Sequence, residues 1–172
     1  MRRVSALVML AALAAPAAAL EVRFREWEDP DEPKWQELEA PFPAFPKDDD
    51  LIEFYVSATT TNRFFVDGAT LSPGADGVVR YALVVRTAGG ATNVTYEGLR
   101  CATLEYRLYA TGRRDGTWVQ ARKGDWKELA NSVTNRQQAA LSRDYLCPSR
   151  LPILTAEEGR DALRRGGHPN AK

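Results

Sequence analysis

The sequence has 172 residues with 23 basic and 23 acidic side chains, so its net charge of zero points neither to nucleic acid nor to an anionic membrane surface as a partner. Residues 1–19 read as a secretory signal peptide, in which Arg2 and Arg3 precede a short apolar run and three alanines form a cleavage site. That run is about half of the ~20 residues that cross a bilayer, so we expect no membrane span. We therefore expect an exported, periplasmic chain whose mature part starts near Leu20 and forms a single domain.

Residues 20–50 are expected to form an acidic, proline-rich arm without regular structure. They carry eleven acidic and four basic side chains, a net charge of −7, against +5 for residues 51–172. Five prolines restrict the backbone. The segment also contains aromatic rings that a disordered acidic tail rarely has, namely Trp27, Trp35, Phe42 and Phe45. We expect these rings to hold the arm against the positive body; the alternative is that PFPAFP is a polyproline II ligand for a partner protein.

Residues 51–165 are expected to form an α+β domain, an antiparallel β-meander sheet with one or two C-terminal helices packed on it. LIEFYVSA (51–58) and RFFVD (63–67) are predicted strands, and GATLSPGADG after them is a loop. Asp48, Asp49 and Asp50 lack the spacing and the distal glutamate of a calcium loop. The glycines of the loop lack the lysine and helix of a phosphate-binding loop. We predict no metal and no cofactor.

The meander starts with VVRYALVVRT, turns at AGGA and returns as NVTYEGLRC. A two-residue loop at Gly89-Gly90 would place Val85 opposite Val94 and Leu83 opposite Tyr96, which joins apolar side chains on one face. Arg80 and Arg86 would then lie on the opposite face, together with Glu97. A second hairpin turns at Asp115-Gly116, the strongest turn signal in the chain.

A polar face of this sheet is the candidate binding site. The residues that we expect to share it are Arg80, Arg86, Glu97, Arg107, Tyr109 and Trp118. Arginine forks and aromatic faces can grip an anionic or sugar-like ligand. Two other interpretations stay open: a half-solvated sheet with cross-strand charge pairs, or a face covered by the acidic arm.

Two short helices and a tail are predicted beyond the meander. Leu141 and Tyr145 lie four residues apart in a helical segment that ends before Pro148. A capping box at residues 155–158 opens a second helix that runs to about Arg165. Residues 166–172 are expected to be a flexible tail, with His168 as a tail residue rather than a ligand.

Cys101 and Cys147 are the only cysteines. An even count in an exported chain predicts one disulfide. The alternative, a reactive thiol, lacks a histidine in the folded region that could activate it.

The strings RFFVDGATLSPGADGVVRYALVVRT, NVTYEGLRC and YATGRRDGTWVQARKGDW resemble the cryptic neisserial protein-like family. The resemblance runs from about Glu53 to Cys147 and implies a place in the Gram-negative cell envelope. It supplies no catalytic residues. Members of the family are often lipoproteins, and this chain differs because no cysteine follows its signal region.

The functional hypothesis is therefore a periplasmic, non-enzymatic binding or interaction domain, whose partner is another envelope protein or an anionic or sugar-like ligand. Two alternatives remain. One is a purely structural envelope component. The other is a hydrolase of an envelope glycan that uses carboxylates, for which Asp67 and Glu97 are the best pair if they are about 5–10 Å apart in an open cleft.

Overall fold

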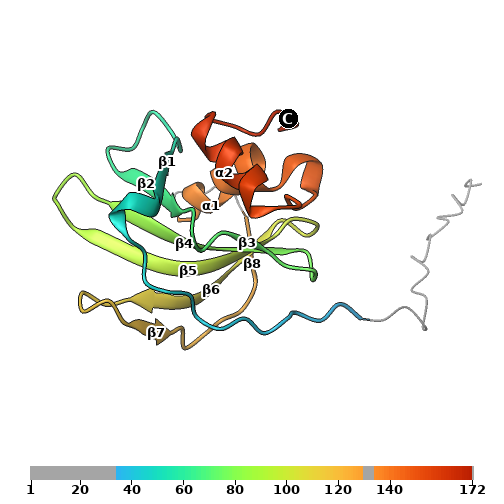
Figure 1. Ribbon diagram of the computed structural model, residues 1–172, viewed down its shortest axis with the longest axis horizontal. Coiled ribbons are helices and arrows are strands. Elements are labelled where there is room, and N and C mark those ends of the chain that lie inside the picture. Colours follow the sequence, from blue (N-terminus) through green and yellow to red (C-terminus); the bar gives the residue numbers. More distant parts are fainter. Residues whose placement is uncertain (1–33, 130–133, 172) are drawn as a thin grey trace, which may run out of the picture. The chain divides into compact units, whose positions relative to one another are not determined.

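The computed structural model describes residues 34–129 and 134–171. Of the two compact units of the chain, Trp35–Lys172 holds every element considered below. This unit is an α+β domain in which one open antiparallel sheet carries short C-terminal helices on one face (Figure 1). No helix among the described residues is long and apolar enough to cross a membrane. The signal peptide predicted for residues 1–19 and residues 20–33 of the predicted arm lie outside the described residues.

The sheet is built from eight strands. Their bounds are β1(Leu51–Phe54), β2(Arg63–Asp67), β3(Ser72–Pro73), β4(Val78–Arg86), β5(Thr92–Arg100), β6(Glu105–Gly112), β7(Trp118–Gln120) and β8(Lys127–Glu128). Neighbouring strands follow the order β1-β2-β4-β5-β6-β7, while β3 pairs with β4 and β8 pairs with β6. The predicted meander of residues 78–122 thus supplies β4, β5, β6 and β7, from the centre of the sheet to one edge.

The three tight hairpins share one loop geometry. In each, the backbone N–H of the residue before the loop donates to the backbone C=O of the residue after it, with three loop residues between them. The pairs are Gly74–Val78, Thr87–Ala91 and Arg113–Thr117. The last loop residue is a glycine with a positive φ: Gly77, Gly90 and Gly116. This left-handed conformation costs glycine nothing, so the glycines determine where each strand reverses.

The AGGA turn differs from the predicted two-residue loop, and this shifts the register of β4 against β5 by one residue. Val84 lies opposite Val94, and Tyr81 lies opposite Glu97. Gly90 supplies the single left-handed residue that a three-residue loop needs, so Ala88 joins the two glycines in the turn. A one-residue shift exchanges the faces of every side chain on one strand relative to the other.

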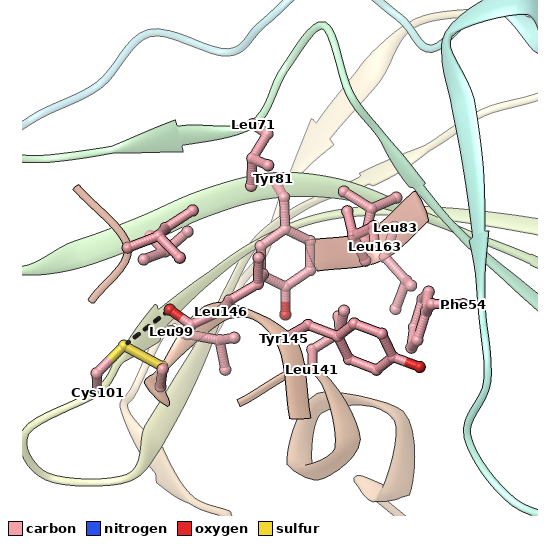
Figure 2. Packing of buried hydrophobic residues seen from close by; sticks show 14 of the residues in the cluster. Phe54, Leu71, Tyr81, Leu83, Leu99, Cys101, Leu141, Tyr145, Leu146 and Leu163 are labelled. Carbon is pink, nitrogen blue, oxygen red and sulfur yellow. Dashed lines mark hydrogen bonds between the residues drawn. A yellow bond between two sulfur atoms is a disulfide. The ribbon is translucent and has the colours of Figure 1, made fainter. Parts of the chain in front are cut away.

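The helices cover the face of the sheet that carries Tyr81, Leu83 and Leu99 (Figure 2). They are α1(Arg136–Ala140), the π-helical turn η2(Leu141–Leu146), the 3-10 turn η3(Pro148–Arg150) and α2(Ala156–Arg164). Leu141 and Tyr145 are buried in this core, as their four-residue spacing predicts. Gly159 allows the close approach of α2, because a Cβ there would lie 2.5–2.6 Å from Ile153 and Leu71.

Two local predictions about the helices are confirmed. The Thr155 hydroxyl accepts the backbone N–H of Glu158 at 3.1 Å and caps α2. A disulfide joins Cys101, just after β5, to Cys147 at the end of η2. Both half-cystines are buried in the cluster between the sheet and the helices.

Strand β1 is shorter than the predicted strand 51–58, because a side chain forms hydrogen bonds with the backbone N–H and C=O of Tyr55. The Tyr145 hydroxyl accepts the Tyr55 N–H and donates to the Tyr55 C=O, both at 3.2 Å. These two backbone groups are thus satisfied without a neighbouring strand.

The C-terminal segment also differs from the flexible tail expected from residue 166. His168 is 8% exposed. Its Nδ1 accepts the Asn170 N–H at 3.1 Å, so in the neutral ring Nε2 carries the proton and donates to Glu158 at 3.0 Å. The backbone N–H of His168 also bonds to the Asp144 carbonyl. These contacts tie the end of the chain to α2 and η2.

Candidate functional site

The face of the sheet opposite the helices is crossed by an extended segment, residues 35–47, which we call the arm (Figure 1). The arm contains no helix or strand. Its contacts are with β4, β5, β6, β7, the loop before β4 and the loop before β8, and we call this side of the sheet the arm face. The predicted packing of the acidic segment on the body therefore holds for residues 35–47, although Trp27 lies outside the described residues.

Four of the six predicted binding residues converge under the arm. Arg80, Arg107, Tyr109 and Trp118 all contact it through their side chains. Arg86 is on the same face but farther along the sheet, where its guanidinium pairs with Asp48 at 2.7 Å and lies over the Phe65 ring.

Glu97 lies on the other face, against α1. It is 3% exposed, and its carboxylate accepts hydrogen bonds from Thr95, Gln138 and Tyr81 at 2.8–3.3 Å. The prediction that it shares the binding face is wrong, because that prediction assumed the register of a two-residue loop. Glu97 lies opposite Tyr81, a core residue, and points the same way.

The carboxylate of Glu37, in the arm, is the centre of the site. It accepts hydrogen bonds from Arg107 Nη1, from the Tyr109 hydroxyl at 2.5 Å and from Trp126 Nε1 at 3.2 Å. Arg80 Nη2 adds an ion pair at 3.6 Å. We call these four donors the carboxylate clamp. Two arginines, a phenol and an indole around one carboxylate form a charge-assisted recognition site.

The phenol of Tyr109 is held as a donor within this clamp. Burial raises the pKa of Tyr109 well above its ordinary value, and the hydrogen bond to the Glu37 carboxylate raises it further. The hydroxyl therefore stays protonated and donates a hydrogen bond to the carboxylate. Gly98 makes room for this ring, because a Cβ at that position would lie 2.6 Å from the hydroxyl oxygen.

The pair Asp76–Arg80 binds the backbone of the arm next to Glu37. Asp76 Oδ2 accepts the Leu38 N–H at 2.8 Å, and Arg80 Nη2 donates to the Leu38 carbonyl at 2.8 Å. The two side chains form a fork–fork ion pair, with 2.7 Å between Arg80 Nη2 and Asp76 Oδ2. Burial raises the pKa of Asp76, but hydrogen bonds from Arg80, Leu38 and Val78 outweigh it and hold that pKa below its ordinary value.

Aromatic contacts hold the arm at its two ends. The Trp35 ring lies 3.8 Å below the Arg100 guanidinium and edge-on to Trp126, and its Nε1 donates to the Asp76 carbonyl at 2.8 Å. Near the other end, Phe45 packs on Trp118 with ring centroids 5.1 Å apart, and Phe42 meets Tyr96 at 6.3 Å. Trp118 Nε1 donates to the Pro43 carbonyl at 2.9 Å.

An open pocket of about 640 Å³ lies between these two groups of contacts. Its walls come from the arm at residues 37–42 and from β6 and β7. Arg107, Tyr109, Gln120 and Arg122 are among the residues that line it. The arm therefore bridges the pocket rather than filling it.

The remaining predictions about chemistry concern buried groups. Asp67 and Glu97 are 2% and 3% exposed, and neither lines the pocket under the arm. Burial raises the pKa of both carboxyls. Among the described residues, no group of three or more histidine, cysteine, aspartate or glutamate side chains is placed to hold a metal ion.

Glu97→Gln is expected to stabilise the protein at neutral pH by about 1 kcal/mol, the size of one buried hydrogen bond. Because the folded-state pKa of Glu97 is above its unfolded value, wild-type stability falls as the pH rises from the ordinary glutamate range through the raised pKa. The amide removes that loss. It can also donate to Gln138 Oε1, a buried oxygen to which no described residue donates a hydrogen bond.

Urea unfolding of both proteins from pH 4 to pH 8 measures this difference, which should vanish at the acid end. Glu53→Gln is the matched control. Glu53 is half exposed, and its hydrogen bond from Arg63 holds its pKa below the ordinary value. We expect no gain from that change. A Glu97→Gln protein that is less stable at every pH would show that the ionised carboxylate supports the fold.

Sequence reasoning missed Glu37, Asp76 and Trp126. Asp76 carries a signal, since Asp-Gly marks a turn, but the signal concerns the backbone and not the partner of the carboxylate. Glu37 is one of eleven acidic residues in its segment, and nothing local distinguishes it. Only the path of the arm over the sheet brings the Glu37 carboxylate, rather than another, to the donors of the clamp.

A family model described as the CNP1-like family matches residues 30–164. The chain is 26% identical over 105 residues to Cryptic neisserial protein 1 of Neisseria gonorrhoeae (strain ATCC 700825 / FA 1090). The matched part covers 54% of this chain and 52% of that protein, so the similarity spans about half the length of the relative. No solved structure matches.

Proposed function

The chain belongs to the CNP1-like family, and we propose that it acts in the cell envelope as a non-enzymatic binding or interaction domain. The site is the arm face, and its ligand is an extended group that carries a carboxylate. This chemistry is narrower than the anionic or sugar-like ligand that the sequence suggests.

The observation that carries the proposal is the carboxylate clamp around Glu37. Arg107, Tyr109 and Trp126 each point a donor at one carboxylate, and Arg80 lies within ion-pair distance. When Glu37 leaves, Arg107 loses its only ion pair among the described residues. The same donors then form a preorganised site for another carboxylate, because β4, β6 and the loop before β8 hold them in place.

The disulfide supports the proposed location. Such bonds persist in oxidising compartments such as the periplasm and are rare in reducing ones. The bridge between Cys101 and Cys147 connects the central sheet to the helical layer, so it is part of the core rather than an exposed, exchangeable bond.

We expect Glu37→Ala to open the clamp to a free carboxylate. With this variant, millimolar N-acetylglutamate should shift the Trp126 indole N–H signal in a ¹H–¹⁵N spectrum, since that group bonds to the Glu37 carboxylate in the wild type. The wild-type protein should respond at least about tenfold more weakly, because its own arm competes at an effective concentration near millimolar.

N-acetylglutamine amide is the matched control ligand, since amide groups replace both carboxylates of N-acetylglutamate at nearly the same shape. Glu37→Ala/Arg107→Ala is the control protein, and it should lose most of the response. Equal shifts with the acid and the amide would contradict the proposal, because the site would then not distinguish a carboxylate.

A further inference from the structure

The arm is bound as an extended peptide is bound by a receptor. Its hydrogen-bond partners on the body lie 38 to 89 positions away in the sequence. Between residues 35 and 45 the body contacts a tryptophan, a carboxylate, one backbone N–H, two backbone carbonyls and two phenylalanines. The arm itself forms no helix or strand that has to be broken before it leaves.

Several features make the arm releasable. Its contacts fall into two groups, residues 35–38 and 42–45, with the open pocket between them. Trp35, Leu38 and Phe42 remain 38–52% exposed although the arm is docked. Burial of these side chains therefore supplies only part of the free energy that full burial would give.

The arm joins the body through a short connection. Phe45 is the last residue packed on the arm face, and the turn η1(Asp48–Asp50) is already attached to the body. Asp48 pairs with Arg86, and the Asp50 carbonyl accepts the Gly68 N–H at 2.9 Å. Only Pro46 and Lys47 lie between, so a change of backbone direction at these two residues would swing the whole arm away.

We propose that the arm docks on the arm face of a second copy of this chain, which gives an arm-exchanged dimer. The proposal rests on the proposed function, because the receiving site is the same carboxylate clamp. A second copy is the occupant with the strongest support, since its residues 35–45 satisfy every subsite. Exchange conserves all of these contacts and alters only the connection at Pro46 and Lys47.

Charge favours the same occupant. The arm, residues 35–47, carries two acidic side chains, Glu37 and Glu39, and one basic side chain, Lys47. The arm face presents Arg80, Arg100 and Arg107 beneath the arm, with Asp76 as the acidic partner of Arg80 and Glu105 as that of Arg100. An emptied arm face is therefore net positive and attracts an acidic segment from another copy.

The test mixes two full-length variants that complement each other. Trp35→Ala/Glu37→Ala has an impaired arm and an intact clamp. Arg107→Ala/Tyr109→Phe has an intact arm and an impaired clamp. Analytical ultracentrifugation should find each variant monomeric at micromolar concentration and a one-to-one complex when they are mixed. The wild type should need at least about tenfold higher concentration to dimerise, because its own arm competes.

A mixture that stays monomeric, with both variants folded by near-ultraviolet circular dichroism, would overturn arm exchange. If either variant fails to fold, the milder pair Glu37→Gln and Tyr109→Phe replaces it. Wild-type protein that stays monomeric up to millimolar concentration would likewise overturn the inference.

The two proposals fail in different ways. Arm exchange fails while the binding function stands if N-acetylglutamate binds Glu37→Ala but the variants do not associate. Both proposals fail if N-acetylglutamate does not bind Glu37→Ala and the variants do not associate. A complex that survives Trp35→Ala/Glu37→Ala in both partners would also exclude arm exchange, because association would then run through another surface.

Discussion

Arg80→Ala is expected to lower the free energy of unfolding by about 3 kcal/mol, the usual cost of removing one partner from a buried ion pair. The Arg80 side chain is 5% exposed and that of Asp76 is 1% exposed. The substitution leaves the Asp76 carboxylate buried without its counter-ion. It also removes the donor to the Leu38 carbonyl, so the arm loosens as well. Urea unfolding at pH 7 measures the loss.

The pH dependence gives the same prediction a second readout. Because the pKa of Asp76 is held below its unfolded value, its stabilising contribution is present above the ordinary aspartate range and is lost as the pH falls through the lowered pKa. The difference between wild type and Arg80→Ala should therefore shrink in acid. Arg86→Ala is the control, since its pair with Asp48 is exposed and worth less than about 1 kcal/mol. Equal losses from both changes would contradict a special role for the buried pair.

Removing the disulfide with Cys101→Ala/Cys147→Ala is expected to cost about 4 kcal/mol in the chain-entropy model, because the half-cystines are 46 positions apart in the sequence. The bridge connects the end of β5 to the end of η2, so without it the helical layer is held to the sheet by packing alone. Chemical unfolding of the double variant against the oxidised wild type measures the loss.

Mass spectrometry after alkylation provides the control for that comparison. The unfolded wild-type protein should gain two adducts only after reduction, and the reduced wild type should unfold like the double variant. Two adducts without reduction, in protein taken from an oxidising compartment, would contradict the bridge. A reduced wild type as stable as the oxidised one would show that the helical layer does not depend on it.

The arm changes how the candidate site is understood. The sequence predicts a polar sheet face that either binds a ligand or is covered by the acidic segment. In the structure the arm covers the face and places the Glu37 carboxylate among its donors. Apolar contacts would be enough to cover a surface. This face also binds the charged carboxylate of Glu37 and the backbone N–H and C=O of Leu38.

Much of the architecture follows from local sequence. Alternating side chains mark β4, β5 and β6, glycines that accept a positive φ mark the three hairpins, and Thr155 marks the start of α2. The disulfide follows from the count of two cysteines together with the export that the sequence predicts. Each of these features depends on a few neighbouring residues or on composition, so the sequence alone determines it.

Register, by contrast, depends on loop geometry that the AGGA turn leaves open. One additional loop residue moves Glu97 from the predicted binding face into the contact with α1. His168 at the C-terminal end shows the same limit, since it is held in place by hydrogen bonds to Glu158 and Asp144, which are distant in the sequence. The tertiary structure alone determines which of the eleven acidic residues enters the site. It brings Glu37 to Tyr109, which lies 72 positions away in the sequence. A carboxylate acquires its role from the donors placed around it, and only the folded sheet brings those donors together.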